Sequence, residues 1–176
     1  MFIAGTDTKI ATLEHAVHLL DEARAERQVI VLTNGVFDLL HLGHVRYLQE
    51  ARSLGDLLVV GVNDDDSVRR LKGPLRPLVP GSERAIVLAA LECVDLVVPF
   101  FDDTAETLVS RLRPDIYVKG GDYDPGATPG QPGYLPEAAI VATNGGRVTI
   151  LPFLPGHSTS ELVRSIVERH ASQPAP

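Results

Sequence analysis

The sequence predicts an α/β protein with a doubly wound parallel sheet of about five strands, flanked by helices in a single domain. Short runs rich in Val, Ile and Leu alternate along the chain with amphipathic, helix-like segments. The 176 residues, 44% of them hydrophobic, suffice for one core, and no repeat or linker divides them. We therefore expect helices on both faces of the sheet, right-handed crossovers, and ligands beyond the carboxyl ends of the strands.

The first elements are a helix, a strand and a second helix. The first helix is indicated by Ile10, Leu13, Val17 and Leu20 at helical spacing, with Thr12 as its N-cap. The β-branched run at residues 29–33 has the length of a buried strand. A glycine-containing loop then leads into a helix over residues 44–53, with Gly55 as its C-cap.

The alternation continues to the end of the chain. Further strands are predicted over residues 57–62, 96–98, 115–118 and 147–151. Further helices are predicted over residues 67–71, 82–91, 105–112 and 158–169, and a short one after the long loop 120–136. Ser82 and Thr104 are predicted as N-caps. We expect residues 1–170 to form the domain and residues 171–176 to be a disordered tail.

Composition and charge argue against several classes of protein. The net charge of −7, from 16 basic and 23 acidic residues, disfavours binding to nucleic acid or to an anionic membrane. No apolar run approaches the roughly 20 residues of a membrane helix. The first residues lack the pattern of a signal peptide, so we expect a cytoplasmic protein. The single cysteine, Cys93, excludes a disulfide framework within the chain and a cysteine-built metal cluster.

The loop after the first predicted strand carries the strongest chemical signal. Residues 33–44 read Thr-Asn-Gly-Val-Phe-Asp-Leu-Leu-His-Leu-Gly-His and lead from a strand into a helix. Gly35 and Gly43 permit close approach of the backbone to a ligand, and a helix N-terminus favours phosphate. His41 and His44 can each donate a hydrogen bond to a phosphate oxygen. A metal site is the less favoured alternative, because no third His or Cys lies nearby.

This stretch resembles the signature of nucleotidyltransferases that contain His-Xaa-Gly-His, the cytidylyltransferase-like superfamily. Further segments, in the same order, resemble one branch of it, the D-glycero-β-D-manno-heptose 1-phosphate adenylyltransferases. They are residues 68–73, 76–77, 83–85, 91–92, 94–95, 103–104, 114–115 and 118–123. The resemblance implies a Rossmann-like sheet. It also implies a reaction in which ATP and a sugar 1-phosphate give an ADP-sugar and pyrophosphate, with Mg²⁺.

The resemblance implies roles for residues of the first loop. His41 and His44 would cover oxygens of the α- and β-phosphates in the transition state. Asp38 would orient the loop, with water-mediated Mg²⁺ binding as the alternative. The nucleotide phosphates would be lined by Thr33, Asn34, Gly35, Phe37 and Gly43.

Basic residues later in the chain are candidate anion ligands. The resemblance favours Lys72 as a mobile phosphate contact that closes over the substrates. The alternative is an ordinary exposed Lys-Gly-Pro turn. Arg84 is a second candidate anion ligand, and the alternative is a surface arginine paired with Glu83 or Asp95.

Two further segments are expected at the substrates. Lys119, Gly121 and Asp122 follow a predicted strand, where a ligand is expected. Ser158, Thr159 and Ser160 open the last helix, and the resemblance implies that they bind the nucleotide phosphates there. The alternative is that one of these hydroxyls is an ordinary N-cap. The run of three aspartates at residues 64–66 is interpreted as a cap for the next helix rather than as a metal site.

The loop over residues 124–136 is several residues longer than in the branch that the chain resembles. It lies next to the expected sugar pocket, so the identity of the acceptor sugar stays open. A cytidylyltransferase acting on glycerol 3-phosphate or a similar polyol phosphate is one alternative function. A nucleotide-binding module without catalysis is another. The resemblance also implies a homodimer, and a separate sugar kinase that supplies the acceptor.

Overall fold

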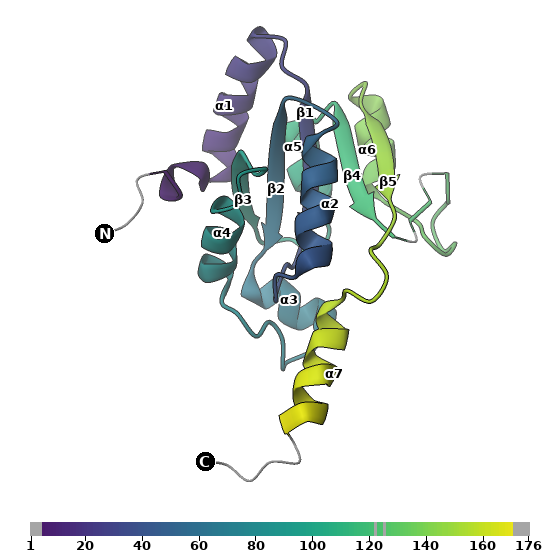
Figure 1. The fold of residues 1–176 in the computed structure, drawn as a ribbon. Helices are drawn as coiled ribbons and strands as arrows, with labels where there is room; N and C mark the ends of the chain where they lie inside the picture. Colours follow the sequence, from purple (N-terminus) through teal and green to yellow (C-terminus); the bar gives the residue numbers. More distant parts are fainter. Residues whose placement is uncertain (1–4, 122, 125, 171–176) are drawn as a thin grey trace.

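A five-stranded parallel sheet forms the centre of the protein in the computed structural model (Figure 1). The structure describes residues 5–121, 123–124 and 126–170. The sheet order is β3-β2-β1-β4-β5. The strands are β1 (Ile30–Gly35), β2 (Leu57–Asn63), β3 (Leu96–Phe100), β4 (Ile116–Gly120) and β5 (Arg147–Leu151). The chain runs outward from β1 to β3, then crosses to β4, so the strand order reverses between β1 and β4. The predicted doubly wound fold is confirmed.

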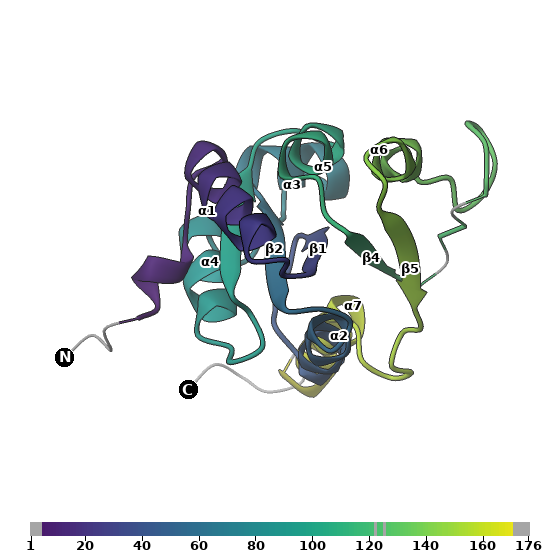
Figure 2. The same ribbon diagram turned by 90° about the horizontal axis from the view of Figure 1, so that it is seen from above.

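Helices cover both faces of the sheet (Figure 2). They are α1 (Leu13–Ala25), α2 (Leu42–Arg52), α3 (Asp65–Lys72), α4 (Gly81–Ala89), α5 (Glu106–Leu112), α6 (Glu137–Thr143) and α7 (Thr159–His170), preceded by a short 3₁₀ helix over Asp7–Lys9. One face carries α1, α5 and α6, and the other carries α2 and α4. The last helix, α7, lies beyond the carboxyl ends of the strands, near the start of α2. No helix in the described ranges has the length and hydropathy needed to cross a membrane.

The core explains why the strands could be recognised from their composition. Alternate residues of β1 point to opposite faces: Ile30 and Leu32 join the cluster beneath α1 and α5, whereas Val31 joins the cluster beneath α2 and α4. All three side chains are fully buried. A strand that is buried on both faces has no polar alternation, and a continuous apolar run results.

Three predicted caps hold in the structure. The hydroxyl of Thr12 accepts a hydrogen bond from the backbone N–H of His15 at the start of α1. Asp64 accepts one from the N–H of Ser67 and so caps α3, as the interpretation of the aspartate run required. Ser158 accepts one from the N–H of Glu161 at the start of α7.

Three other predicted caps are wrong, two of them because distant carboxylates take their place. The N-cap of α4 is Pro80 rather than Ser82, and the N–H of Gly81 donates to the side chain of Asp65. The N-cap of α5 is Ala105 rather than Thr104, and its N–H donates to Glu137. The C-cap of α2 is Ser53 rather than Gly55. The predicted tail at residues 171–176 lies outside the described residues.

Candidate active site

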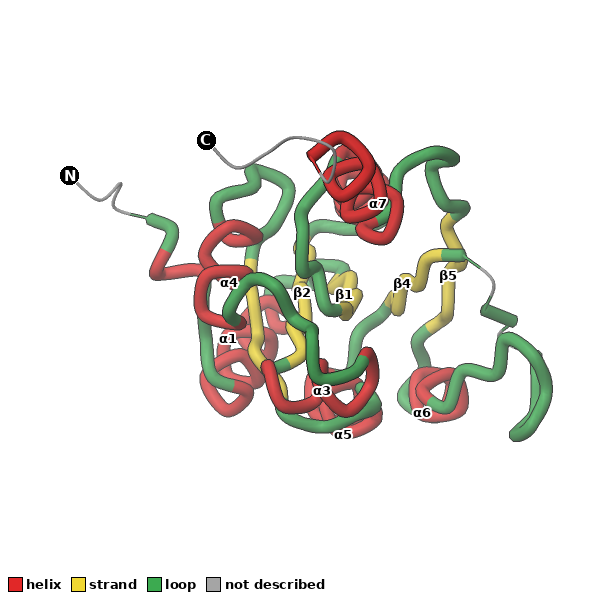
Figure 3. The backbone as a smooth tube through the Cα atoms, turned by 90° about the horizontal axis from the view of Figure 1, so that it is seen from below, coloured by secondary structure: helices red, strands yellow, loops and turns green. Residues whose placement is uncertain are grey.

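A cleft of about 1170 Å³ opens at the carboxyl ends of β1 and β4. Figure 3 looks at the sheet from below, with α7 on one side of the strands and α3, α5 and α6 on the other. The strand order reverses at this place, and open α/β sheets bind ligands there. Most residues predicted for the site line it: Asn34, Gly35, Phe37, Asp38, His41, Gly43, His44, Lys72, Lys119, Ser158, Thr159 and Ser160.

The two histidines of the first loop form a stacked pair at the start of α2. Their ring centroids lie 3.8 Å apart with an interplanar angle of 24°. His41 is the N-cap of α2, and its Nδ1 accepts a hydrogen bond of 3.4 Å from the backbone N–H of His44. Phe37 packs edge-on against His44, with ring centroids 5.2 Å apart. The pair is therefore held in one orientation by the helix cap on one side and by Phe37 on the other.

Both imidazoles are shifted toward the neutral form. Burial, and then the neighbouring His41, lower the pKa of His44 to about 4. Burial also lowers the pKa of His41, and His157 adds to this effect. At neutral pH the cleft therefore presents two neutral rings that can each donate one hydrogen bond. An anion beside them would favour the charged form.

The start of α7 lies against the start of α2. A Cβ atom placed on Gly43 would come within 3.0 Å of the carbonyl oxygen of His157 and of the His41 ring. This close approach explains why glycine stands between the two histidines. It brings Ser158, Thr159 and Ser160 into the same cleft as the histidine pair. Two helix N-termini, each favourable to phosphate, thus border one space.

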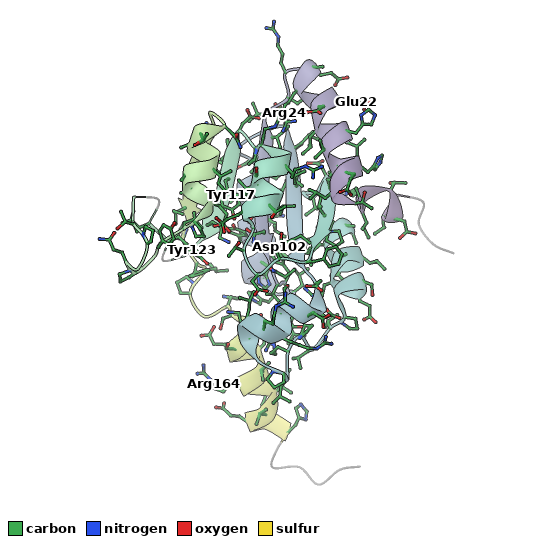
Figure 4. All side chains as sticks on the ribbon, turned by 180° about the vertical axis from the view of Figure 1, so that it is seen from behind. Glu22, Arg24, Asp102, Tyr117, Tyr123 and Arg164 are labelled. Atoms are coloured by element: carbon green, nitrogen blue, oxygen red, sulfur yellow. The ribbon has the colours of Figure 1, made fainter. Side chains whose placement is uncertain are left out.

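A buried polar cluster forms the floor of the cleft between β1 and β4. The side-chain carbonyl of Asn34 accepts hydrogen bonds from the Tyr117 hydroxyl, at 2.6 Å, and from the Lys119 ammonium, at 3.1 Å. Burial lowers the pKa of Lys119 from its usual value. Tyr117 belongs to the core cluster beneath α5 and α6, which lie toward the viewer in Figure 4. The Lys119 ammonium lies 5.0 Å from the ring centroid of Tyr123. Lys119 thus brings a cation into the half of the cleft opposite α2.

Asp38 acts on a neighbouring loop. It is buried, and its Oδ1 accepts hydrogen bonds from the backbone N–H groups of Leu78 and Val79, at 2.7 and 2.9 Å. Its Oδ2 lies 2.6 Å from Nε of Arg76. The prediction placed Asp38 in the orientation of its own loop, whereas the structure shows it binding the segment over residues 76–79. Both of its oxygens therefore have partners within the protein.

Lys72 lines the cleft as the last residue of α3, directly before the segment that Asp38 holds. Arg76, within that segment, also lines the cleft.

Arg84 lies outside the cleft lining, which corrects its prediction as an anion ligand. It is 2% exposed, and its guanidinium donates to the carbonyls of Val36, Asn63 and Val79 and pairs with Asp65. The predicted alternative, a surface arginine paired with Glu83 or Asp95, is also wrong. Through these hydrogen bonds and the ion pair, Arg84 connects the loop that follows β1 with the segment that follows β2. Its neighbours are distant in sequence, so only the fold could reveal this role.

Two further predicted residues, Thr33 and Gly121, are described in the structure but are not among those that line the cleft. Thr33 is buried, and its hydroxyl lies 2.7 Å from that of Tyr47. Gly121 has φ = 88°, and the ring of Phe153 occupies the place that a Cβ would take. Asp122 lies outside the described residues.

Residues that were not predicted as members of the site also line the cleft. They include Asn63, Asp103, Thr104, Tyr134, Glu137 and Phe153. Glu137 directly precedes an apolar helical segment, a position where a sequence pattern cannot distinguish a buried carboxylate from an exposed one.

The described residues do not build a metal site. No group of three or more His, Cys, Asp or Glu side chains among them could hold an ion. Mg²⁺ is commonly held by substrate phosphates together with water and few protein ligands. These residues are therefore compatible with a Mg²⁺ ion that is held mainly by the phosphates of a nucleotide.

The fold and the cleft agree with the comparison to known families. Residues 32–145 match the model of the family described as cytidylyltransferase-like, and the chain belongs to this family.

Among individual relatives, the chain is 49% identical over 164 residues to the bifunctional protein HldE of Syntrophotalea carbinolica. It is 51% identical over 165 residues to the bifunctional protein HldE of Alkalilimnicola ehrlichii. These alignments cover 93% and 94% of this chain but 32% of each relative, so the chain spans about a third of their length.

Two solved structures are also similar to this chain. A lipopolysaccharide core biosynthesis protein from Thermoplasma volcanium matches with a TM-score of 0.54 and 32% identity. The match covers 72% of this chain and 97% of that one. Pantoate-beta-alanine ligase from Francisella tularensis also has a TM-score of 0.54, at 11% identity over 94% of this chain and 79% of that one, which shows a shared fold.

Proposed function

We propose that this chain is a nucleotidyltransferase that joins AMP from ATP to a sugar 1-phosphate. The proposed acceptor is D-glycero-β-D-manno-heptose 1-phosphate, and the products are ADP-heptose and pyrophosphate. One observation carries the proposal: the stacked pair of His41 and His44 shares a cleft with the start of α7, where the fold favours nucleotide phosphates. The high identity to the HldE proteins supports this branch over others in the family.

The chemistry needs positioning and charge neutralisation more than a protein nucleophile. An oxygen of the sugar phosphate attacks the α-phosphorus of ATP, and a new P–O bond forms. The bond between the α-phosphorus and the oxygen that bridges to the β-phosphate breaks, and pyrophosphate leaves with that electron pair. The attacking oxygen is already anionic, so no general base is required. In-line orientation of the two substrates accounts for much of the rate in such reactions.

The residues of the cleft suit these tasks. His41 and His44 donate hydrogen bonds to the α- and β-phosphate oxygens, where negative charge develops. The N–H groups and hydroxyls at the start of α7 hold the rest of the triphosphate. Lys72 approaches from the end of α3 and contacts the phosphates as its loop closes. Mg²⁺ enters bound to ATP and so belongs to the substrate.

Pyrophosphate release by the purified protein tests the proposal. ATP, CTP, GTP and UTP are each paired with heptose 1-phosphate, glycerol 3-phosphate and several hexose 1-phosphates, in the presence of Mg²⁺. Release with ATP and heptose 1-phosphate alone is the expected result. Release with CTP and a polyol phosphate would move the protein to a cytidylyltransferase. Nucleotide binding without release from any pair would favour a module without catalysis.

Further proposals concern the source of the acceptor, the oligomeric state and the location of the protein. The acceptor requires a kinase step that phosphorylates the sugar at its anomeric position. We also propose a homodimer in the cytoplasm. The exposed apolar side chains of α7, Leu162, Ile166 and Val167, support a subunit contact. Sedimentation at several protein concentrations tests the homodimer.

A further inference from the structure

Glu137 is a buried carboxylate with one oxygen that has no partner among the described residues. It is the first residue of α6 and is 4% exposed. Its Oε1 accepts a hydrogen bond of 2.8 Å from the backbone N–H of Ala105. Its Oε2 is buried and has no hydrogen-bond partner. An unsatisfied buried acceptor of this kind is costly, and the hydrogen bond from Ala105 accounts for only the other oxygen.

The position of Glu137 suggests a ligand as the missing partner, because the residue lines the cleft. The same lining includes Ala105, which donates to Oε1, with Thr104 beside it in the segment after β3, and Lys119 at the end of β4. The charge of Glu137 favours the protonated form of Lys119, against the effect of burial on the pKa of that amine. The two residues thus place an acceptor and a cation in the same half of the cleft.

This half differs in chemistry from the half where the triphosphate is proposed to bind. The phosphate half offers the histidine pair and the start of α7, which are hydrogen-bond donors. A carboxylate repels phosphate but accepts hydrogen bonds from hydroxyl groups, and it can accept two from neighbouring hydroxyls of a sugar. The ammonium of Lys119 suits the phosphate that such a sugar carries.

We infer that Glu137 is a specificity-determining residue that accepts hydrogen bonds from the hydroxyl groups of the acceptor sugar through Oε2. This inference rests on the proposed function and deepens it, because it assigns the two halves of the cleft to the two substrates. The loop over residues 124–136 ends directly before Glu137. A change in loop length therefore acts on the position of the residue that selects the sugar.

The test compares wild type with Glu137→Gln, which keeps the size of the side chain and can still accept from Ala105. Pyrophosphate release is measured with varied sugar 1-phosphate at saturating ATP, and then with varied ATP at saturating sugar. We expect the KM for the sugar 1-phosphate to rise about tenfold or more and the KM for ATP to change less than about twofold. Glu83→Gln, an exposed glutamate on α4, is the matched control and leaves both KM values unchanged.

Acceptors that lack single hydroxyl groups separate recognition from a structural role. With wild type, removing the hydroxyl that Glu137 contacts raises the KM for the acceptor. With Glu137→Gln, the same removal has a much smaller further effect, because the partner is already weakened. A merely structural role would give equal losses with every deoxy acceptor in both proteins.

The outcomes distinguish the inference from the proposed function. An active wild type whose Glu137→Gln variant shows an unchanged acceptor KM, or a raised KM for ATP instead, overturns the inference alone. The second result would assign Glu137 to the nucleotide ribose. A well-folded wild type that releases no pyrophosphate from any nucleotide and sugar phosphate overturns the proposed function, and the inference with it.

Discussion

The carboxylate of Asp38 lies 2.6 Å from the guanidinium of Arg76 and so joins the first loop of the cleft to the segment that follows α3. The same carboxylate accepts two backbone hydrogen bonds from Leu78 and Val79. Arg84 reinforces the junction by donating to the carbonyls of Val36 and Val79. The segment that follows Lys72 is therefore fastened at its far end and can move mainly near the lysine.

Asp38→Asn tests this fastening. The amide removes the negative charge beside Arg76 and weakens the hydrogen bonds from Leu78 and Val79. The free energy of unfolding should therefore fall by about 1–3 kcal/mol. The value of kcat should fall about tenfold or more, because Lys72 is held less well over the phosphates. Chemical denaturation and steady-state kinetics measure the two effects.

Asp66→Asn is the matched control for that substitution. Asp66 pairs with Arg69 on the surface, where its side chain is 73% exposed, so its loss should cost less than about 1 kcal/mol. Equal losses of stability in the two variants would mean that the buried junction contributes no more than a surface pair.

Replacing either histidine of the stacked pair tests the proposed catalytic role. His41→Ala and His44→Ala should each lower kcat by about 10²–10³, because each removes a donor to charge that develops in the transition state. The fold should survive, since neither ring belongs to the two core clusters. His18→Ala, on the exposed surface of α1, serves as the control. Turnover near the wild-type rate in either cleft variant would contradict the mechanism.

The pH dependence of nucleotide binding follows from the environment of His44. In the free protein its pKa is about 4, so the ring is neutral at pH 7. A bound triphosphate raises the pKa of His44. At pH values between the pKa of the free protein and that of the complex, ATP binding is therefore accompanied by proton uptake. Affinity should rise as pH falls through the pKa of the bound state.

Calorimetry of ATP binding in buffers of different ionisation enthalpy measures this proton uptake at constant pH. Wild type should take up a larger fraction of a proton than His44→Asn. ATP's own titration is common to both proteins and cancels in the difference. Identical uptake would show that His44 stays neutral beside the phosphates.

Local sequence patterns predict the strands and the histidine pair. They cannot predict contacts between residues that are distant in sequence. Strands such as β1 could be predicted because burial on both faces leaves a continuous apolar run. The histidine pair could be predicted because both rings flank one helix start. Neither alternative predicted for Arg84 includes its true partner, because only the fold brings Asp65 beside it. Likewise, the local pattern predicts Ser82 as a cap, because nothing in that pattern shows that Asp65 reaches Gly81.

Gly43→Ala tests whether the close approach of α2 and α7 is needed for nucleotide binding. The added methyl group would lie 3.0 Å from the carbonyl of His157 and from the His41 ring, which is closer than ordinary packing allows. Alanine is also the better helix former by about 1 kcal/mol, which offsets part of the cost in stability. We therefore expect a small change in melting temperature together with a clear rise in the KM for ATP, because the start of α7 must move away from the histidine pair.

Gly81→Ala is the matched control. Its methyl group would meet the side chain of Arg84 at 3.1 Å, at the start of a helix outside the cleft lining. Equal changes in the KM for ATP would mean that crowding at any helix start weakens binding, and the contact between α2 and α7 would then have no special role.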